Sequence, residues 1–161
     1  MSPSQFTALY KEYVTDISQY FFVTPRMSEE EAEQTAQEYL EDPYAQVMPI
    51  YAGEEATASS PAGFLIVCRK GGDCHPNADY FIAQLYVKKE YREKKLAQKA
   101  VLSFVSSHPG IYCYDVLLQN LPAILFWRYM EKEYGWEKVK LREIRPLYMT
   151  ADINAKAFRA I

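Results

Sequence analysis

Cysteine and histidine are scarce in this chain, which argues against a disulfide framework and a zinc centre. The 161 residues include 3 cysteines and 2 histidines. Cys68, Cys74 and Cys113 are an odd and scattered set, so we expect free thiols in a reducing cytoplasm rather than disulfides. Cys74 stands beside His75 without the spaced partners of a zinc site, so we expect no bound metal.

Long apolar runs and a large excess of one charge are missing too. No stretch approaches the roughly 20 apolar residues of a membrane span, and the first residues have neither the basic start nor the core of a signal peptide. The net charge of −3 argues against general nucleic-acid binding. No repeat, low-complexity segment or linker divides the chain. We therefore expect one domain over 1–161, cytoplasmic and without membrane contact.

What the sequence does contain is a clear alternation of helical and strand-like patterns. Capping signals and apolar residues at helical spacing predict helices over 3–21, 28–40, 96–105 and 121–134, the first of them starting from a capping box at Ser2. Alternating or continuous apolar runs predict strands over 46–52, 62–70, 80–87, 111–118, 139–144 and 147–153. The tail, 154–161, could add a short helix. This order of elements predicts an α/β fold.

A basic turn joins the strand at 80–87 to the helix that begins at Leu96. Its cations are Lys88, Lys89, Arg92, Lys94 and Lys95, with Lys99 one turn into the helix. Cations are unfavourable there because a helix N-terminus carries partial positive charge. Free amides at a helix start, flanked by cations, make a phosphate site. A solvated charged turn is the plainer alternative.

The same stretch resembles motif A of the GCN5-related N-acetyltransferase (GNAT) superfamily. LYV at 85–87 and YREKKLA at 91–97 are similar to a strand ending in L-x-V that leads to R-x-x-G-x-G/A. NLPAILFW at 120–127, followed by YGW at 134–136, resembles the family's N-x-x-A-x-x-F-Y and terminal G-F. The chain most resembles a subgroup of acetyltransferases with an N-x-P-A-x-x-F-W-R motif. The match extends over about 62–136.

The resemblance implies a single GNAT-like domain with a mixed, mostly antiparallel sheet flanked by helices. In the family's count, parallel strands 4 and 5 splay apart beside the cofactor. Family members usually start with a strand before the first helix, whereas this chain enters a helical capping box at Ser2. Either the sheet is one strand short or the sequence begins late.

The resemblance also implies acetyl-CoA as co-substrate. The backbone of Leu85, Tyr86 and Val87 would bind the pantetheine arm and polarise the thioester carbonyl. The amides of the turn would hold the pyrophosphate, through Arg92, Glu93, Lys94, Lys95, Leu96, Ala97 and Gln98. From the second motif, Asn120 would bond the pantetheine amide, and Ala123, Phe126 and Trp127 would pack along the cofactor. The aromatic pair would equally suit a plain helix core.

Three residues depart from the family pattern. Lys95 stands where the pyrophosphate loop normally has its first glycine, whose missing side chain lets the backbone approach phosphates. Trp127 stands where many members have a tyrosine acid, and an indole cannot give up its proton near neutral pH. Gln84 takes the place of a glutamate base. Tyr129 and Asp115 are the titratable candidates that remain for catalysis.

These features favour two functions. The first is an N-acetyltransferase that moves the acetyl group directly from acetyl-CoA to an amine of a small molecule or protein. The alternative is a catalytically weak or inactive GNAT-fold domain that binds coenzyme A or a protein partner. We expect a monomer or homodimer. The acidic face of the helix at 28–40 is either solvated or forms a wall for the amine acceptor.

Overall fold

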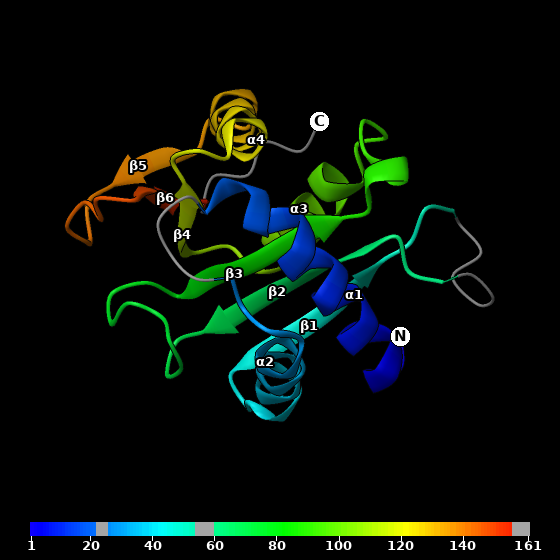
Figure 1. Cartoon of the computed structure of the whole chain (residues 1–161). Helices are drawn as coiled ribbons and strands as arrows, with labels where there is room; N and C mark the ends of the chain where they lie inside the picture. The colour runs from blue at the N-terminus through cyan, green and yellow to red at the C-terminus, as the bar shows by residue number, and fades with distance from the viewer. Residues whose placement is uncertain (22–25, 54–59, 156–161) are drawn as a thin grey trace. The chain divides into compact units, whose positions relative to one another are not determined.

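A computed structural model describes residues 1–21, 26–53 and 60–155 of the chain (Figure 1). Its contacts divide the chain into two compact units. The first contains Met1–Ile66 and Gln84–Ala100, and the second contains Val67–Ala83 and Val101–Ile161. Strands β2 (Gly63–Arg69) and β3 (Tyr80–Val87) therefore each contribute residues to both units.

Within the described residues the strands form a six-stranded sheet in the order β1-β2-β3-β4-β6-β5. The remaining strands are β1 (Ala45–Ile50), β4 (Ile111–Leu117), β5 (Glu137–Val139) and β6 (Tyr148–Asn154). β3 and β4 are parallel, with Tyr80, Phe81 and Ile82 opposite Tyr112, Cys113 and Tyr114. β6 pairs antiparallel with β4 and β5. The predicted α/β fold with a mixed sheet is confirmed.

The first unit contains two helices that both begin where the sequence predicts. Capping boxes start α1 (Pro3–Ile17) at Ser2 and α2 (Glu29–Glu41) at Ser28. α1 buries Phe6, whose ring meets Phe64 of β2 edge-on, with ring centroids 5.3 Å apart. The apolar face of α1 is thus packed on the sheet, while its other face carries charged side chains.

The second unit has its core around β4 and α4 (Leu121–Glu133). Asn120 caps α4, because its side-chain oxygen accepts a hydrogen bond from the Ala123 amide at 3.2 Å. Trp127 of α4 stacks on Tyr114 of β4 with ring centroids 4.2 Å apart. Gly135, two residues after the end of α4, has a φ of 62°, the left-handed conformation common after helices.

Two predicted elements differ from the structure. The first helix ends at Ile17 instead of residue 21, followed by a 3-10 turn at Ser18–Tyr20. The Ser18 hydroxyl donates to the Thr15 carbonyl at 2.7 Å, so a side chain satisfies a carbonyl of the last turn. The strand predicted at 139–144 is also wrong: β5 covers Glu137–Val139, and 140–147 is irregular. The helix considered for the tail falls largely on 156–161, outside the described residues.

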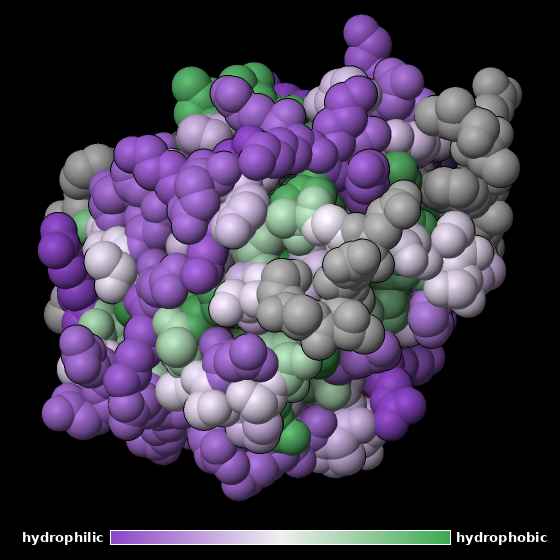
Figure 2. All heavy atoms as spheres, turned by 90° about the vertical axis from the view of Figure 1, so that its right-hand side faces the viewer, coloured by the Kyte–Doolittle hydropathy of each residue, from purple (hydrophilic) through white to green (hydrophobic). Residues whose placement is uncertain are grey.

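The described cysteines are free thiols, as expected. Cys68 and Cys113 are buried, and burial raises the pKa of the Cys74 thiol to about 12. None of the described helices is both long enough and apolar enough to cross a membrane. Figure 2 shows one face of the molecule, on which hydrophilic side chains (purple) cover more area than hydrophobic ones (green).

Candidate functional site

The turn between β3 and α3 (Leu96–Ser107) has an unusual backbone. After a 3-10 turn at Lys89–Tyr91, Glu93 has a φ of 64° and Lys95 a φ of 58°. Among the described residues these are the only non-glycine positions in the left-handed region. Such a backbone costs an L-residue about 1–2 kcal/mol. Left-handed residues alternating with ordinary ones curve successive amides into a concave, anion-binding nest.

The amides at this turn lie at the start of the helical hydrogen-bond ladder. The first bond beyond the turn joins the Lys99 amide to the Lys95 carbonyl at 3.0 Å. The amides of Leu96 and Ala97 therefore precede the helical bonds, and they point toward the helix N-terminus. The side chains of Lys89, Lys94, Lys95 and Lys99 are exposed around them. The turn thus combines backbone donors, a helix dipole and exposed cations, which is the chemistry of a phosphate site.

Substituting Lys95 by glycine should raise the stability of the fold by about 1 kcal/mol. Glycine removes the left-handed penalty of about 1–2 kcal/mol and gives part of it back through its larger unfolded-state entropy. For a chain of this length we expect Tm to rise by about 2–4 °C. The matched control is Lys94→Gly, because the φ of Lys94 is not positive. That variant should lower Tm, and a fall for both would contradict the strain at position 95.

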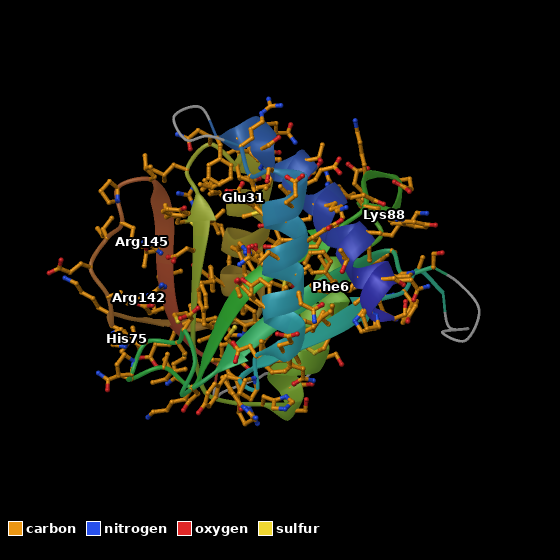
Figure 3. All side chains as sticks on the ribbon, turned by 60° about the horizontal axis from the view of Figure 1, so that its bottom comes forward. Phe6, Glu31, His75, Lys88, Arg142 and Arg145 are labelled. Carbon is orange, nitrogen blue, oxygen red and sulfur yellow. The ribbon has the colours of Figure 1, made fainter. Side chains whose placement is uncertain are left out.

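Arg92 is held by the structure around the turn. Its Nε donates to the Val87 carbonyl at 2.9 Å, and its Nη2 donates to Asp16 of α1 at 2.8 Å. Its guanidinium also lies 5.9 Å from the centroid of the Tyr86 ring. Lys88, labelled in Figure 3, forms an ion pair with Glu12 of α1 at 3.7 Å. The sequence predicted Arg92 at the anion site but gave no sign of its α1 partners.

An open hollow of about 440 Å³ lies on this side of α1. Four α1 residues and Tyr86 of β3 line it: Lys11, Glu12, Thr15, Asp16 and Tyr86. Burial, followed by the charges of Glu12 and Asp16, raises the pKa of Tyr86 to about 12. The phenol therefore keeps its proton at neutral pH, so it can donate a hydrogen bond but cannot act as a base.

Gln84, which replaces the expected glutamate base, is paired with a tyrosine. Its side-chain oxygen accepts a hydrogen bond from the hydroxyl of Tyr13 on α1. The Tyr13 ring in turn lies 5.8 Å from that of Tyr86. An amide does not take up a proton in this pH range, so Gln84 cannot serve as the general base.

Asp115, a candidate for catalysis, is part of an ion-pair network in the second unit. Its carboxylate accepts hydrogen bonds from Arg142 at 3.2 Å, Arg145 at 3.0 Å and the Thr150 hydroxyl at 3.0 Å. Figure 3 shows Arg142 and Arg145 close together beside the last strands. Donors thus occupy the carboxylate oxygens, a geometry typical of a structural aspartate. Its catalytic role stays a prediction that these contacts do not favour.

The remaining predicted residues lie on α4. Trp127 is 5% exposed and packs against Tyr114, so in the second unit it is a core side chain. Phe126 is half-buried beside it, and Tyr129 is 46% exposed. The buried hydroxyl of Tyr114 donates to Glu131 at 2.6 Å, and burial followed by this bond raises the pKa of Tyr114. Proposed cofactor contacts of Ala123, Phe126 and Trp127 stay predictions.

The structure therefore groups the predicted residues into two sets, one in each unit. The first unit contains Leu85 to Val87 and the turn from Arg92 to Gln98. The second contains Asp115, Asn120 and the α4 residues. Glu12, Tyr13 and Asp16 of α1 were not identified from the sequence as partners of the predicted site residues. The signal that could have found two of them is the pair of acids one helical turn apart on α1.

No protein-family model and no curated protein sequence matches the chain. Solved structures do share its architecture. An acetyltransferase from Thermus thermophilus has a TM-score of 0.65 at 17% identity, covering 94% of this chain and 92% of that one. A GNAT-family acetyltransferase from Staphylococcus aureus has a TM-score of 0.56 at 12% identity, covering 91% and 92%. The fold is that of GNAT acetyltransferases.

The same fold occurs in a larger assembly. The NatC complex, solved with Gag peptide and CoA, has a TM-score of 0.50 at 15% identity, covering 94% of this chain and 87% of that one. At such identities the likeness is one of fold. The order of helices and strands in this chain is thus one that solved acetyltransferases also have.

Proposed function

We propose that this chain is an N-acetyltransferase that uses acetyl-CoA and an amine acceptor on a small molecule or protein. The observation that carries the proposal is the left-handed turn at Glu93–Lys95, which opens α3 directly after β3. Exposed lysines surround it, and the fold is shared with acetyltransferases, among them a complex bound to CoA. Backbone amides and cations together suit a pyrophosphate better than a single carboxylate.

The residues of the turn fit this co-substrate. Lys95 keeps the left-handed backbone that a glycine would adopt, so the curvature of the amides does not depend on glycine. The amides of Leu96 and Ala97 would meet the phosphates, with Lys94 and Lys95 supplying charge. The backbone of Leu85 to Val87 would hold the pantetheine arm, as the family resemblance implies. The bulk of the lysine side chain would turn toward the phosphates or into solvent.

Bound acetyl-CoA supplies an activated acetyl group as a thioester. The chain's residues must then orient the acceptor and let its ammonium lose a proton before attack. Neither Gln84 nor the protonated Tyr86 accepts that proton at neutral pH. Glu12 and Asp16 line the open hollow beside α1, but both are in ion pairs, with Lys88 and Arg92, so water in this hollow is the route that we assign to the proton. In this assignment the protein binds acetyl-CoA and polarises its thioester carbonyl, and bulk water removes the proton of the amine.

Acetyl-CoA should stabilise the folded chain if the turn binds its pyrophosphate. At tenfold over Kd, binding contributes about 1.4 kcal/mol, which corresponds to a Tm rise of about 3–6 °C. Lys94→Ala should reduce this shift because it removes one of the cations of the turn. Lys132→Ala, an exposed lysine of α4 in the second unit, is the matched control and should leave the shift unchanged. No shift at millimolar acetyl-CoA or CoA would contradict the proposal.

A second function, a coenzyme A-binding domain with weak or no catalysis, is favoured by one observation. The position of the expected base is occupied by Gln84, already bonded to Tyr13. Such a domain would show the same thermal shift with CoA but no release of free thiol from acetyl-CoA in the presence of amines or peptides. Thiol release with any acceptor amine would decide for the enzyme.

A further inference from the structure

Helix α1 presents two carboxylates, one turn apart, to the cations that flank the turn between β3 and α3. Glu12 pairs with Lys88 at 3.7 Å, and Asp16 pairs with Arg92 at 2.8 Å. Asp16 is separated from Arg92 by 76 residues in sequence, and all four side chains belong to the first unit. The two pairs differ, because only the Asp16 pair is also anchored to the backbone of β3.

Arg92 is fixed from two sides. Its Nε donates to the carbonyl of Val87, the last residue of β3, while its Nη2 donates to Asp16. A guanidinium has five N–H groups in one plane, so three of them take no part in these two bonds. Two bonds in a plane fix the plane itself, and the direction of the remaining N–H groups follows from it. Because the Arg92 side chain is already ordered, binding a phosphate does not cost it further conformational entropy.

We infer that Asp16 is a positioning residue for co-substrate binding: it holds the Arg92 guanidinium so that its remaining N–H groups meet the pyrophosphate of acetyl-CoA. This inference rests on the proposed function. Asp16 itself does not touch the phosphates in this arrangement and acts through Arg92.

The negative charge of Asp16 has an opposing effect on phosphate affinity, so the direction in which affinity changes on its removal tests the inference. The carboxylate of Asp16 is negative and lies near the anion site, so Coulomb repulsion alone would weaken phosphate binding. The Asp16 side chain is 28% exposed, so water and salt screen this repulsion. The hydrogen bond from Arg92 to Asp16 is short and directional, so it still orients the guanidinium when the longer-range repulsion is screened. Positioning therefore predicts that removing the charge of Asp16 weakens binding, whereas simple repulsion predicts that it strengthens binding.

The test measures the Kd for CoA by calorimetry in the wild type and in Asp16→Asn, Asp16→Glu and Arg92→Ala variants. Asp16→Asn should raise Kd about tenfold, because an amide oxygen accepts a weaker hydrogen bond from a guanidinium than a carboxylate does, and Asp16→Glu should recover most of the loss. In an Arg92→Ala background, Asp16→Asn should have no further effect, because the residue acts through Arg92. Glu12→Gln, which removes the neighbouring ion pair with Lys88, is the matched control and should change Kd less than twofold.

The outcomes separate this inference from the proposed function. Wild-type protein that fails to bind CoA contradicts the proposed function itself. Wild-type binding with an Asp16→Asn Kd that is equal or lower overturns the positioning role and leaves the function standing. An equal loss in the Arg92→Ala background would also overturn it, because Asp16 would then act independently of Arg92. Tm measured without ligand shows whether any variant has lost its fold.

Discussion

Replacing Arg142 by alanine should lower the stability of the chain by about 3 kcal/mol, and Tm by about 6–12 °C. Its guanidinium donates to Asp152 at 2.7 Å and to Asp115 at 3.2 Å, and it bonds the carbonyls of Tyr114 and Ala151. The carboxylates of Asp152 and Asp115 are only 4% and 9% exposed. Without the arginine, each of the two buried carboxylates loses one of its partners. This loss costs more free energy than the intact ion pairs contribute to stability.

Thermal unfolding followed by circular dichroism measures this loss. Arg145→Ala is the matched control, because Arg145 bonds the same Asp115 but is 60% exposed. An exposed pair of this kind contributes at most about 1 kcal/mol. Arg142→Lys should fall in between, since a lysine keeps the charge and loses the planar set of donors. If Arg142→Ala were as stable as Arg145→Ala, the ion pairs of Arg142 with Asp115 and Asp152 would not stabilise the fold as we expect.

Gly63→Ala should cost about 3 kcal/mol, because the new methyl group has no space. A Cβ at Gly63 would lie 2.0 Å from the carbonyl oxygen of Tyr86 and 2.9 Å from the Cα of Val87. Both are backbone atoms, so the contact can be relieved only by moving β2 away from β3. We expect Tm to fall by about 6–12 °C. Under the proposed function, acetyl-CoA affinity should fall as well, because Tyr86 and Val87 lead into the anion-binding turn.

Gly53→Ala is the control for this substitution. A Cβ at Gly53 meets no atom within 4 Å, so the change should stay within about 0.5 kcal/mol. Hydrogen exchange of the amides of β3 would report whether Gly63→Ala separates the strands. If both variants melted at the same temperature as the wild type, the close approach of β2 to β3 would be refuted.

Local signals in the sequence were enough for most of the fold. Ser2 with Gln5 and Ser28 with Glu31 mark helix starts through contacts three residues apart, and the structure has both. The strand predicted at 139–144 failed because its residues bond to distant partners. The amides of Leu141 and Arg142 donate to Asp152, and the Arg142 side chain reaches Asp115. Such tertiary contacts override an alternating apolar pattern.

In the candidate site too, the sequence predicted the features with a local pattern and did not predict the contacts between distant residues. The basic turn at Arg92–Lys95 was predicted as a helix start with cations, and the structure places it there. The bond from Asp16 to Arg92 was missed because no local pattern links residues 76 positions apart. Trp127 was ambiguous in sequence, since an aromatic residue on an apolar stripe suits both a cofactor and a core. Its stacking on Tyr114 identifies the core contact.

The left-handed backbone at Lys95 has a consequence for how such a turn changes during evolution. An anion cradle made of amides depends on the path of the chain and is indifferent to the side chain, apart from a strain of about 1–2 kcal/mol per left-handed residue. Under the proposed function, a lineage can therefore lose the glycine, gain a positive charge and keep the shape of the cradle, at a cost that one added phosphate contact would offset. Divergent chains of this kind would share geometry after their glycine signature has disappeared.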